Sequence, residues 1–388
     1  MEGTKYFSIL IVGGTGVIST AVAAEAHRQG IVVTMINRGT RNLPSWAELI
    51  KCDKNDFSTI ASHLRGRRFT SVMDFLCYTD EQTTDSFNFY SQFTDQYFFV
   101  SYCAVFDKTK LGIKTEESPK PLKIWSYSVN KYKSEEHLKS IAKDRNCHYT
   151  IVRPCVTYGD TRIPYGIMPQ YGFHWTLCAR ILANKPIIRW NGGTTRTNMM
   201  RVEDYAVGMV GLIGNPRAYD EDFNICGDEM PSFNEVIEAI EITLKCKAKI
   251  IDVTSDFYAK EMPNKSEEIL GGRSIDATNS NQKIKNTVPS FKQSISLREG
   301  VAMTVKAYQE QGYQHGIDWR FDADTDRIIK KWCKNNQIEY KQYNLKFVDY
   351  LGNATFHDTI LYYIEFYKEN KGLLLGLRIL NKILRLFS

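Results

Sequence analysis

The residues FSILIVGGTGVIS, Phe7–Ser19, decide the fold of the first part of this 388-residue chain. Phe7–Val12 is a nearly continuous apolar run, which is typical of a strand buried on both faces of a parallel sheet. The run ends at two glycines, and a helix is predicted shortly after them, over Thr20–Gln29. A strand, a glycine turn and a helix in this order place backbone N–H groups at a helix N-terminus, where they favour an anion.

Further buried strands alternate with helical spacers, which predicts a doubly wound parallel sheet with right-handed crossovers. After about residue 160 the pattern becomes irregular and indicates a smaller mixed α/β lobe. The expected strands of the sheet are Ile31–Ile36, one ending near Cys52, Ser71–Cys77, Gln96–Val100 and Thr150–Pro154. The expected elements of the lobe are helices at Trp175–Ala183, Tyr205–Ile213 and Phe233–Leu244 and a strand at Lys249–Val253.

We therefore expect an α/β protein of three regions. Residues 1–165 form a Rossmann domain whose sheet later segments complete, 166–330 a substrate-binding lobe, and 331–388 a helical C-terminal extension. In the final stretch, Gly372–Ser388, the cations Arg378, Lys382 and Arg385 recur at helical spacing among apolar residues. Such a basic amphipathic helix either packs on the protein or a sister subunit, or makes peripheral contact with a membrane.

The composition, with 43% hydrophobic and 24% charged residues, is that of a soluble globular protein. A net charge of +6 is mild over this length and favours anionic ligands, but the chain lacks the dense basic stripe of a DNA-binding protein. The nine cysteines show no spacing that suits zinc, so we expect a reducing compartment and no metal site. No signal peptide and no run of 18 apolar residues is visible, which predicts a cytoplasmic protein.

The glycine turn has the pattern of a dinucleotide-binding turn, with Ser19 where a third glycine is usual. The predicted pyrophosphate contacts are Gly13, Gly14, Thr15, Gly16, Val17 and Ile18. At the end of the second strand, Asn37 and Arg38 occupy the position that selects the ribose, and neither repels a 2′-phosphate. NADP is therefore the favoured cofactor, and NAD is the alternative. Asp53 is placed to accept a hydrogen bond from the adenine amine.

Tyr127 and Lys131 lie one helical turn apart on the same face of a predicted helix. A phenol with an ordinary pKa near 10 is a poor base at neutral pH, but a neighbouring ammonium favours the phenolate. Such a tyrosine can take a proton from a hydroxyl group while hydride leaves the same carbon, and can return it in the reverse direction. The pair therefore predicts hydride-transfer chemistry.

The segments GGTGVIS, FFVSYCAVF, YSVNK and IVRPCVTYGD together resemble the extended short-chain dehydrogenase/reductase family, over about residues 5 to 330. The resemblance implies that Tyr127 and Lys131 are catalytic, that Pro154 contacts the cofactor, and that the protein is a homodimer acting on a nucleotide sugar. It implies substrate contacts at His174, Arg196 and Arg201. The stretch 190–330 looks closest to epimerase/dehydratase-like proteins that include chloroplast RNA-binding relatives.

Three positions depart from the family pattern. Tyr102 stands where the family has the Ser or Thr that bonds the reacting oxygen, so that either its phenol substitutes, or neighbouring Ser101 rotates in, or the donor is missing. Cys103-Ala104 replaces the acidic pair of the dehydratases, which disfavours water elimination, and Val156 replaces an Asn of some epimerases. The leading hypothesis is an NAD(P)-dependent nucleotide-sugar epimerase. The alternatives are an NADPH-dependent ketoreductase and a binding protein of RNA-binding type with weakened catalysis.

Overall fold

The computed structural model describes residues 7–39, 44–169, 173–312 and 316–384. The chain forms two compact units, and each unit is built from several segments. Two later segments of the chain belong with the first unit. The first unit comprises Met1–Gly159, Arg196–Pro231 and Ile275–Leu297, and the second comprises Asp160–Thr195, Ser232–Ser274 and Arg298–Ser388.

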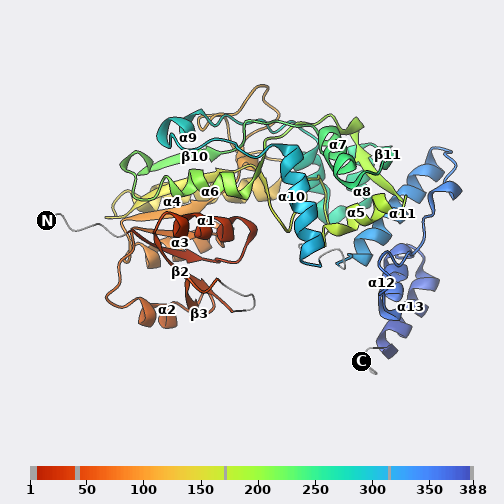
Figure 1. Ribbon diagram of the computed structural model, residues 1–388, viewed down its shortest axis with the longest axis horizontal. Coiled ribbons are helices and arrows are strands. Elements are labelled where there is room, and N and C mark those ends of the chain that lie inside the picture. The colour runs from red at the N-terminus through yellow and green to blue at the C-terminus, as the bar shows by residue number, and fades with distance from the viewer. Residues whose placement is uncertain (1–6, 40–43, 170–172, 313–315, 385–388) are drawn as a thin grey trace. The chain divides into compact units, whose positions relative to one another are not determined.

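The first unit is built on a seven-stranded sheet whose strands pair in parallel, as predicted. Its strand order is β10-β6-β5-β4-β1-β2-β3, so the order reverses between β1 and β4, where doubly wound sheets bind ligands. The strands of this sheet are β1 Ser8–Val12, β2 Val32–Asn37, β3 Glu48–Lys51, β4 Ser71–Asp74, β5 Gln96–Val100, β6 His148–Pro154 and β10 Glu221–Ile225. The other elements (Figure 1) are α1 Val17–Arg28, α2 Phe57–Leu64, α3 Asp80–Tyr90, η1 Cys103–Val105, α4 Ser126–Ala142, β7 Val156–Tyr158, β9 Met199–Arg201, α6 Val202–Val210, η3 Pro216–Ala218 and α9 Gln282–Thr287.

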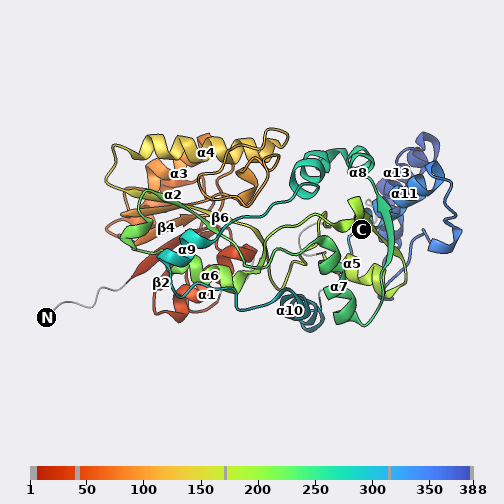
Figure 2. The same cartoon turned by 90° about the horizontal axis from the view of Figure 1, so that it is seen from above.

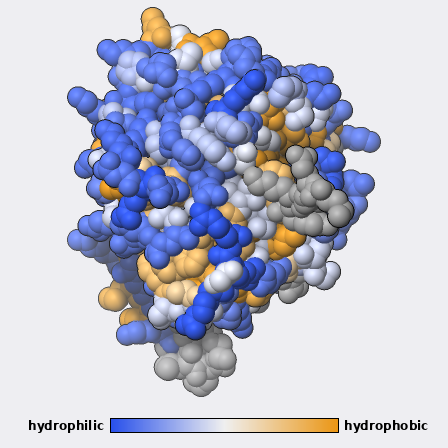
Figure 3. Space-filling model, turned by 90° about the vertical axis from the view of Figure 1, so that its left-hand side faces the viewer, coloured by the Kyte–Doolittle hydropathy of each residue, from blue (hydrophilic) through white to orange (hydrophobic). Residues whose placement is uncertain are grey.

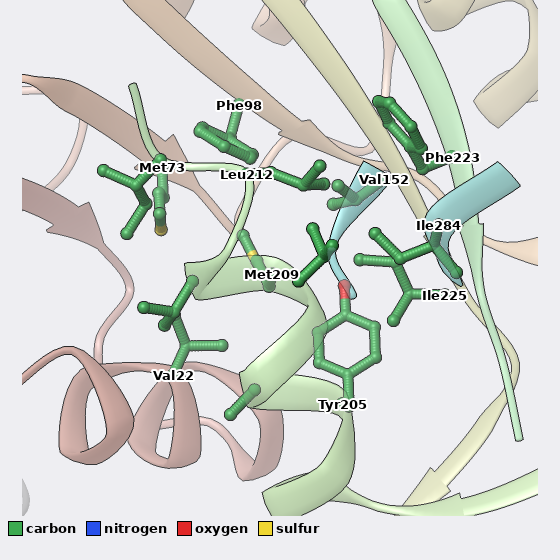
Figure 4. Packing of buried hydrophobic residues seen from close by; sticks show 14 of the residues in the cluster. Val22, Met73, Phe98, Val152, Tyr205, Met209, Leu212, Phe223, Ile225 and Ile284 are labelled. Carbon is green, nitrogen blue, oxygen red and sulfur yellow. The ribbon is translucent and has the colours of Figure 1, made fainter. Parts of the chain in front are cut away.

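Alternate residues of the buried strands cover the two faces of this sheet. On β1, Ile9 and Ile11 belong to the core beneath α1, α6 and α9, whereas Leu10 and Val12 belong to the core beneath α2, α3 and α4. Figure 2 shows these helices on either side of the sheet. Figure 4 shows the first of these cores, which includes Val22 of α1, Met209 of α6, and Met73 and Val152 of the sheet.

A segment from late in the chain completes the sheet, because β10 pairs in parallel with β6. The helix α6 comes from the same late segment and packs against α1. A short parallel pair of strands, β7 and β9, joins the end of the early segment to the start of the late one. The first unit is therefore assembled from residues that are far apart in the sequence.

Two of the element boundaries that differ from the predicted ones have a local cause. The first helix begins at Val17 rather than at Thr20, because Gly16 is its N-cap and the Ser19 hydroxyl accepts the Gly16 N–H. The fourth strand ends at Asp74 rather than at Cys77, because the Asp74 carboxylate accepts the Leu76 N–H at 2.7 Å and forms a turn. Both ends are decided by side chains that bond the backbone.

In the second unit, the strands β8 and β11 pair in parallel among helices. The indole of Trp190 lies at the centre of this lobe against Tyr165, Phe233 and Tyr258. A Cβ on Gly166 would approach that ring to 1.8 Å, so the close packing requires glycine there. The elements are α5 Trp175–Leu182, β8 Pro186–Trp190, η2 Asn191–Gly193, α7 Phe233–Leu244, β11 Lys249–Val253, α8 Ser255–Glu261, η4 Pro263–Lys265, η5 Glu268–Arg273, α10 Leu297–Glu310, α11 Trp319–Asn335, η7 Lys341–Tyr343, α12 Phe356–Phe366 and α13 Lys371–Leu384.

The C-terminal helices are tied to this lobe by a buried cluster of charges. Asp322 and Asp326 on α11 each bind both Arg180 and Lys185, and all four side chains are at most 1% exposed. The hydroxyl of Tyr362 on α12 donates to Asp326. The helices α11, α12 and α13 belong to the second unit.

The face of the molecule in Figure 3 is mostly hydrophilic, with apolar side chains gathered in a few patches. Among the described residues, no helix is both long enough and apolar enough to cross a membrane.

Candidate functional site

The turn between β1 and α1 is held by the side chain of Ser19. Its hydroxyl donates to the Gly13 carbonyl at 2.9 Å and accepts the Gly16 N–H at 2.9 Å. The Thr15 N–H donates to the Gly13 carbonyl at 2.9 Å, and Val17 begins the helix, with Ile18 as its second residue. The serine that replaces the usual third glycine therefore acts as an internal brace of the turn.

Two glycines of this turn are required by its geometry. Gly13 has a φ of +86°, and a Cβ at this position would lie 2.6 Å from Cγ of Leu76. A Cβ on Gly14 would lie 2.8 Å from Sδ of Met35. No acidic side chain lies in the first turn of α1, so the electrostatic environment at this helix end favours an anion. One side of the turn therefore packs closely against Leu76 and Met35, and the N–H groups at the start of α1 are suited to bind a phosphate.

Asn37 and Arg38 lie at the carboxyl end of β2, next to β1. The side-chain oxygen of Asn37 accepts the Gly39 N–H at 2.8 Å, whereas its Nδ2 is buried with no hydrogen-bond partner among the described residues. Arg38 is exposed, and so is Asp53, whose carboxylate accepts the Asn55 N–H at 2.9 Å. A buried amide donor without an acceptor fits a ribose hydroxyl, because leaving such a group unpaired costs free energy.

Lys131 projects from α4 to the carboxyl ends of β4 and β5. Its Nζ donates to the carbonyls of Cys77 at 2.6 Å and Val100 at 2.9 Å, and it lies 5.0 Å from the ring centres of Tyr78 and Phe99. The side chain is buried, and this desolvation lowers its pKa to about 8. The spacing in the sequence predicts that Lys131 lies beside Tyr127, but no local pattern predicts the two carbonyl groups that accept hydrogen bonds from its ammonium.

Tyr127 lies in a small group of aromatic rings at the start of α4. Its ring centre is 6.1 Å from that of Tyr102 and 5.4 Å from that of Trp125. Both tyrosines are half-buried. The structure thus brings Tyr102, which follows β5, to the side chain that the sequence predicts as the base.

The hydroxyl of Ser101 already has a hydrogen-bond partner within the protein. Its hydroxyl donates to Glu135 on α4, and both residues are buried, at 3% and 0% exposure. The guanidinium of Arg153 binds the same carboxylate at 2.8 and 2.7 Å. Ser101 is therefore part of a buried ion-pair network, and Glu135 is a partner that sequence reasoning missed because it lies 34 residues away.

Three other positions singled out in the sequence are buried near the carboxyl ends of β5 and β6. Cys103 donates its S–H to the Arg153 carbonyl at 3.3 Å, and burial raises the pKa of its thiol well above the ordinary value. It is thus a packed thiol rather than a nucleophile. Pro154 is the last residue of β6, opposite Ile225 of β10, and Val156 begins β7.

The three predicted substrate residues differ in their surroundings. Arg196, in the first unit, is exposed and donates to the Met230 carbonyl at 2.9 Å. Arg201, in the same unit, is 1% exposed and binds Glu203 through two nitrogens. His174 belongs to the second unit, where its Nδ1 accepts the Ile163 N–H at 3.2 Å and burial lowers its pKa to about 3. His174 is therefore neutral at physiological pH.

Comparisons with known proteins agree with this architecture. Residues 89–226 match the model of the NAD dependent epimerase/dehydratase family. The fold is similar to that of UDP-glucose 4-epimerase from Thermotoga maritima, with a TM-score of 0.63 and 18% identity over 79% of this chain and 99% of that one. It is also similar to UDP-glucuronic acid 4-epimerase from Bacillus cereus, with a TM-score of 0.62 and 17% identity over 79% and 100%.

One curated relative is named for binding a stem-loop and not for an epimerase activity. The chain is 24% identical over 246 residues to a chloroplast stem-loop binding protein of 41 kDa from Arabidopsis thaliana. The match spans 60% of this chain and 61% of that protein. The matched segment is therefore similar to the NAD dependent epimerase/dehydratase family, and the parallel sheet has the fold of the epimerases of known structure.

Proposed function

We propose that this protein is an NAD(P)-dependent epimerase of a nucleotide sugar, acting by transient oxidation of a sugar hydroxyl. The observation that carries the proposal is the position of Tyr127 one helical turn before Lys131, whose ammonium is held at the ends of β4 and β5. One of the two similar epimerase structures contains UDP-glucose, and the other contains UDP-glucuronic acid and NAD, which supports this class of substrate and cofactor.

The residues of the first unit fit a nicotinamide dinucleotide. The Gly13–Ser19 turn would hold the pyrophosphate, and the unpaired Nδ2 of Asn37 would donate to the adenosine ribose. Arg38 favours NADP through a 2′-phosphate, and Asp53 and Pro154 remain candidates for further contacts. When bound, the dinucleotide supplies a hydride acceptor that becomes the hydride donor on return.

Tyr127 then moves the proton. Its phenolate takes the proton of a sugar hydroxyl as the carbon beneath it gives up hydride, which leaves a carbonyl group on the sugar. After hydride returns to the opposite face of that carbonyl, Tyr127 gives the proton back to the oxygen. The Lys131 ammonium stabilises the phenolate, because a positive charge nearby favours the negative form.

A second hydrogen bond to the reacting oxygen comes, in this proposal, from Tyr102. Its ring lies beside Tyr127, whereas the Ser101 hydroxyl is bound to Glu135. Arg196 remains the candidate for the substrate diphosphate because it is exposed and a guanidinium binds such a group in a fork. His174 and Arg201 are weaker candidates, since a protein hydrogen bond already occupies each of them.

One observation favours a second candidate, an NADPH-dependent ketoreductase with the same residues. Asn37 and Arg38 carry no negative charge to repel a 2′-phosphate, and NADPH is the usual donor for a one-way reduction. In that reaction Tyr127 donates its proton to the carbonyl oxygen as hydride arrives.

The test is turnover of a panel of UDP-sugars with NAD or NADP, with epimers and reduced products resolved by chromatography. We expect interconversion of one epimer pair without net cofactor consumption, and a fall of about 10²- to 10⁴-fold in kcat for Tyr127→Phe. The matched control is Ser140→Ala, an exposed position of the same helix, which should leave kcat unchanged. Unchanged turnover by Tyr127→Phe would contradict the proposal. So would the absence of turnover together with tight binding of a stem-loop RNA, the property in the name of the curated relative.

A further inference from the structure

Three apolar side chains of the helix α13 are exposed to solvent. Leu373 is 50% exposed, Leu375 is 64% exposed and Ile379 is 52% exposed. On the preceding helix α12, Phe356 is 64% exposed. Several large apolar side chains exposed on one helix are unusual on the surface of a monomer and mark an interaction site.

The cations of α13 lie along one edge of this apolar face. With about 100° of rotation per residue, Lys371, Arg378 and Lys382 fall within about 40° of one another on the helix. Leu375 and Ile379 lie directly beside this edge on the same projection. Among the described residues, none of the three cations has an ion-pair partner, and α13 contains no acidic residue. Arg385, which continues the basic pattern in the sequence, lies outside the described residues.

The helix is held in place by its other face. Leu374 and Leu377 are half-buried, and α13 lies beside α12 (Figure 1). The His357 ring on α12 bonds the Asn381 side chain at 2.9 Å. Because α12 is in turn fixed to α11 through Tyr362 and Asp326, the apolar face belongs to an anchored helix.

A hollow of about 470 Å³ opens at the beginning of α13. Lys330 of α11 and Lys371 of α13 both line it, together with the rings of Phe366 and Tyr367. Glu369 is the acidic residue among its lining side chains, and it is already bound to Arg327 and Lys331. Lys330 therefore adds a cation from α11 to those that α13 presents, at the hollow that Lys371 also lines.

We propose that α13 docks this protein on a membrane surface that contains anionic lipids. An apolar face bordered by cations is the arrangement of a helix that lies in the interface, with its apolar side chains among the acyl chains and its cations among the headgroups. The 14 described residues of α13 are too few to span the hydrocarbon core, and their length suits a position in the interface. A second copy of α13 is a poor occupant, because it brings the same cations and no carboxylate to pair with them.

The experiment is cosedimentation of the full chain with vesicles of phosphatidylcholine alone or with phosphatidylglycerol added. We expect binding to the mixed vesicles only, with weakening at high salt. The double variant Arg378→Gln/Lys382→Gln should bind about 30-fold more weakly, since each cation near an anionic surface contributes about 1 kcal/mol. Leu375→Ser/Ile379→Ser should lower binding by at least about tenfold.

Matched controls come from the same unit. Lys334→Gln, an exposed cation of α11, and Ile242→Ser, a 51% exposed position of α7, should leave vesicle binding unchanged. Circular dichroism and thermal melting verify that each variant is folded. Equal binding to both kinds of vesicle, or binding that survives Leu375→Ser/Ile379→Ser, would overturn the proposal. A dimer by light scattering that the same variant dissociates, without vesicle binding, would assign the face to a second copy instead.

Discussion

The hydroxyl of Ser101 donates a hydrogen bond to the carboxylate of Glu135, which also receives two hydrogen bonds from Arg153. Ser101 follows β5 directly, and its neighbour Tyr102 lies with its ring against Tyr127. Two adjacent residues thus point to different environments, one into a buried ion-pair network and the other toward the predicted base. The sequence left open whether Tyr102 or Ser101 takes the place of the usual serine or threonine that bonds the reacting oxygen. The different surroundings of the two side chains favour Tyr102.

The first prediction concerns this pair of residues. Tyr102→Phe should lower kcat by at least about tenfold with little change in stability, because it removes only the phenol oxygen that would bond the reacting group. Ser101→Ala should leave kcat within about twofold and lower the free energy of unfolding by about 1 kcal/mol, because it removes a donor to a buried carboxylate. Steady-state kinetics and urea unfolding of both variants measure these effects. The reverse result would show that Ser101 is the donor to the substrate.

The second prediction concerns the pH dependence of activity. Burial lowers the pKa of Lys131 to about 8, so its ammonium is lost as the pH rises through that value. The Tyr127 phenolate then loses its stabilising charge, and kcat/KM should fall above about pH 8. Lys131→Met should be less active at neutral pH and should lack this limb of the pH profile.

The same shift has a consequence for stability. The folded pKa of Lys131, about 8, lies below the ordinary value of 10.5, so the unfolded chain binds more protons between these two values. The free energy of unfolding should therefore gain a contribution as the pH rises from about 8 to 10.5, and Lys131→Met should lack it. Urea unfolding across this pH range, with the exposed Lys133→Met on the same helix as the control, measures the difference.

The third prediction concerns the choice of dinucleotide. Arg38→Ala should weaken NADPH binding by about tenfold while leaving NADH nearly unchanged, because only NADPH carries the 2′-phosphate. Asn37→Asp should shift the preference toward NADH, since a carboxylate accepts the ribose hydroxyl and repels a phosphate. Calorimetric titration of each variant with both dinucleotides gives the ratio. Equal weakening of both by Arg38→Ala would exclude the proposed contact.

The fourth prediction concerns the buried charges of the second unit. Asp326→Asn should lower the free energy of unfolding by about 3 to 5 kcal/mol, because it leaves the buried cations Arg180 and Lys185 with one carboxylate between them. Asp256→Asn, at an exposed position in the first turn of α8, should cost no more than about 1 kcal/mol. Thermal or urea unfolding compares the two, and an equal loss would contradict the structural role of the cluster.

Patterns over a few residues were enough to predict many of the strands and helices of the fold. The apolar run before Gly13 predicts a buried strand, and the predicted bounds Gln96–Val100, Phe233–Leu244 and Lys249–Val253 are confirmed. Burial alternates with a period of two residues in a strand and about 3.6 in a helix, so it can be recognised locally. The spacing of Tyr127 and Lys131 on one helix face was visible for the same reason.

Contacts between distant residues were decided only in the tertiary structure. The sequence could not show that Ser101 turns toward Glu135, that Lys131 reaches the carbonyls of Cys77 and Val100, or that Arg201 is buried against the chain. Nor could it show that α11 closes a charge cluster with Arg180, a residue of α5. A side chain's direction and partner depend on which elements the fold packs against it, and no local pattern encodes that packing. The sequence by itself thus determined the Rossmann unit and its pair of tyrosine and lysine, and the tertiary structure decided which neighbouring groups can assist them.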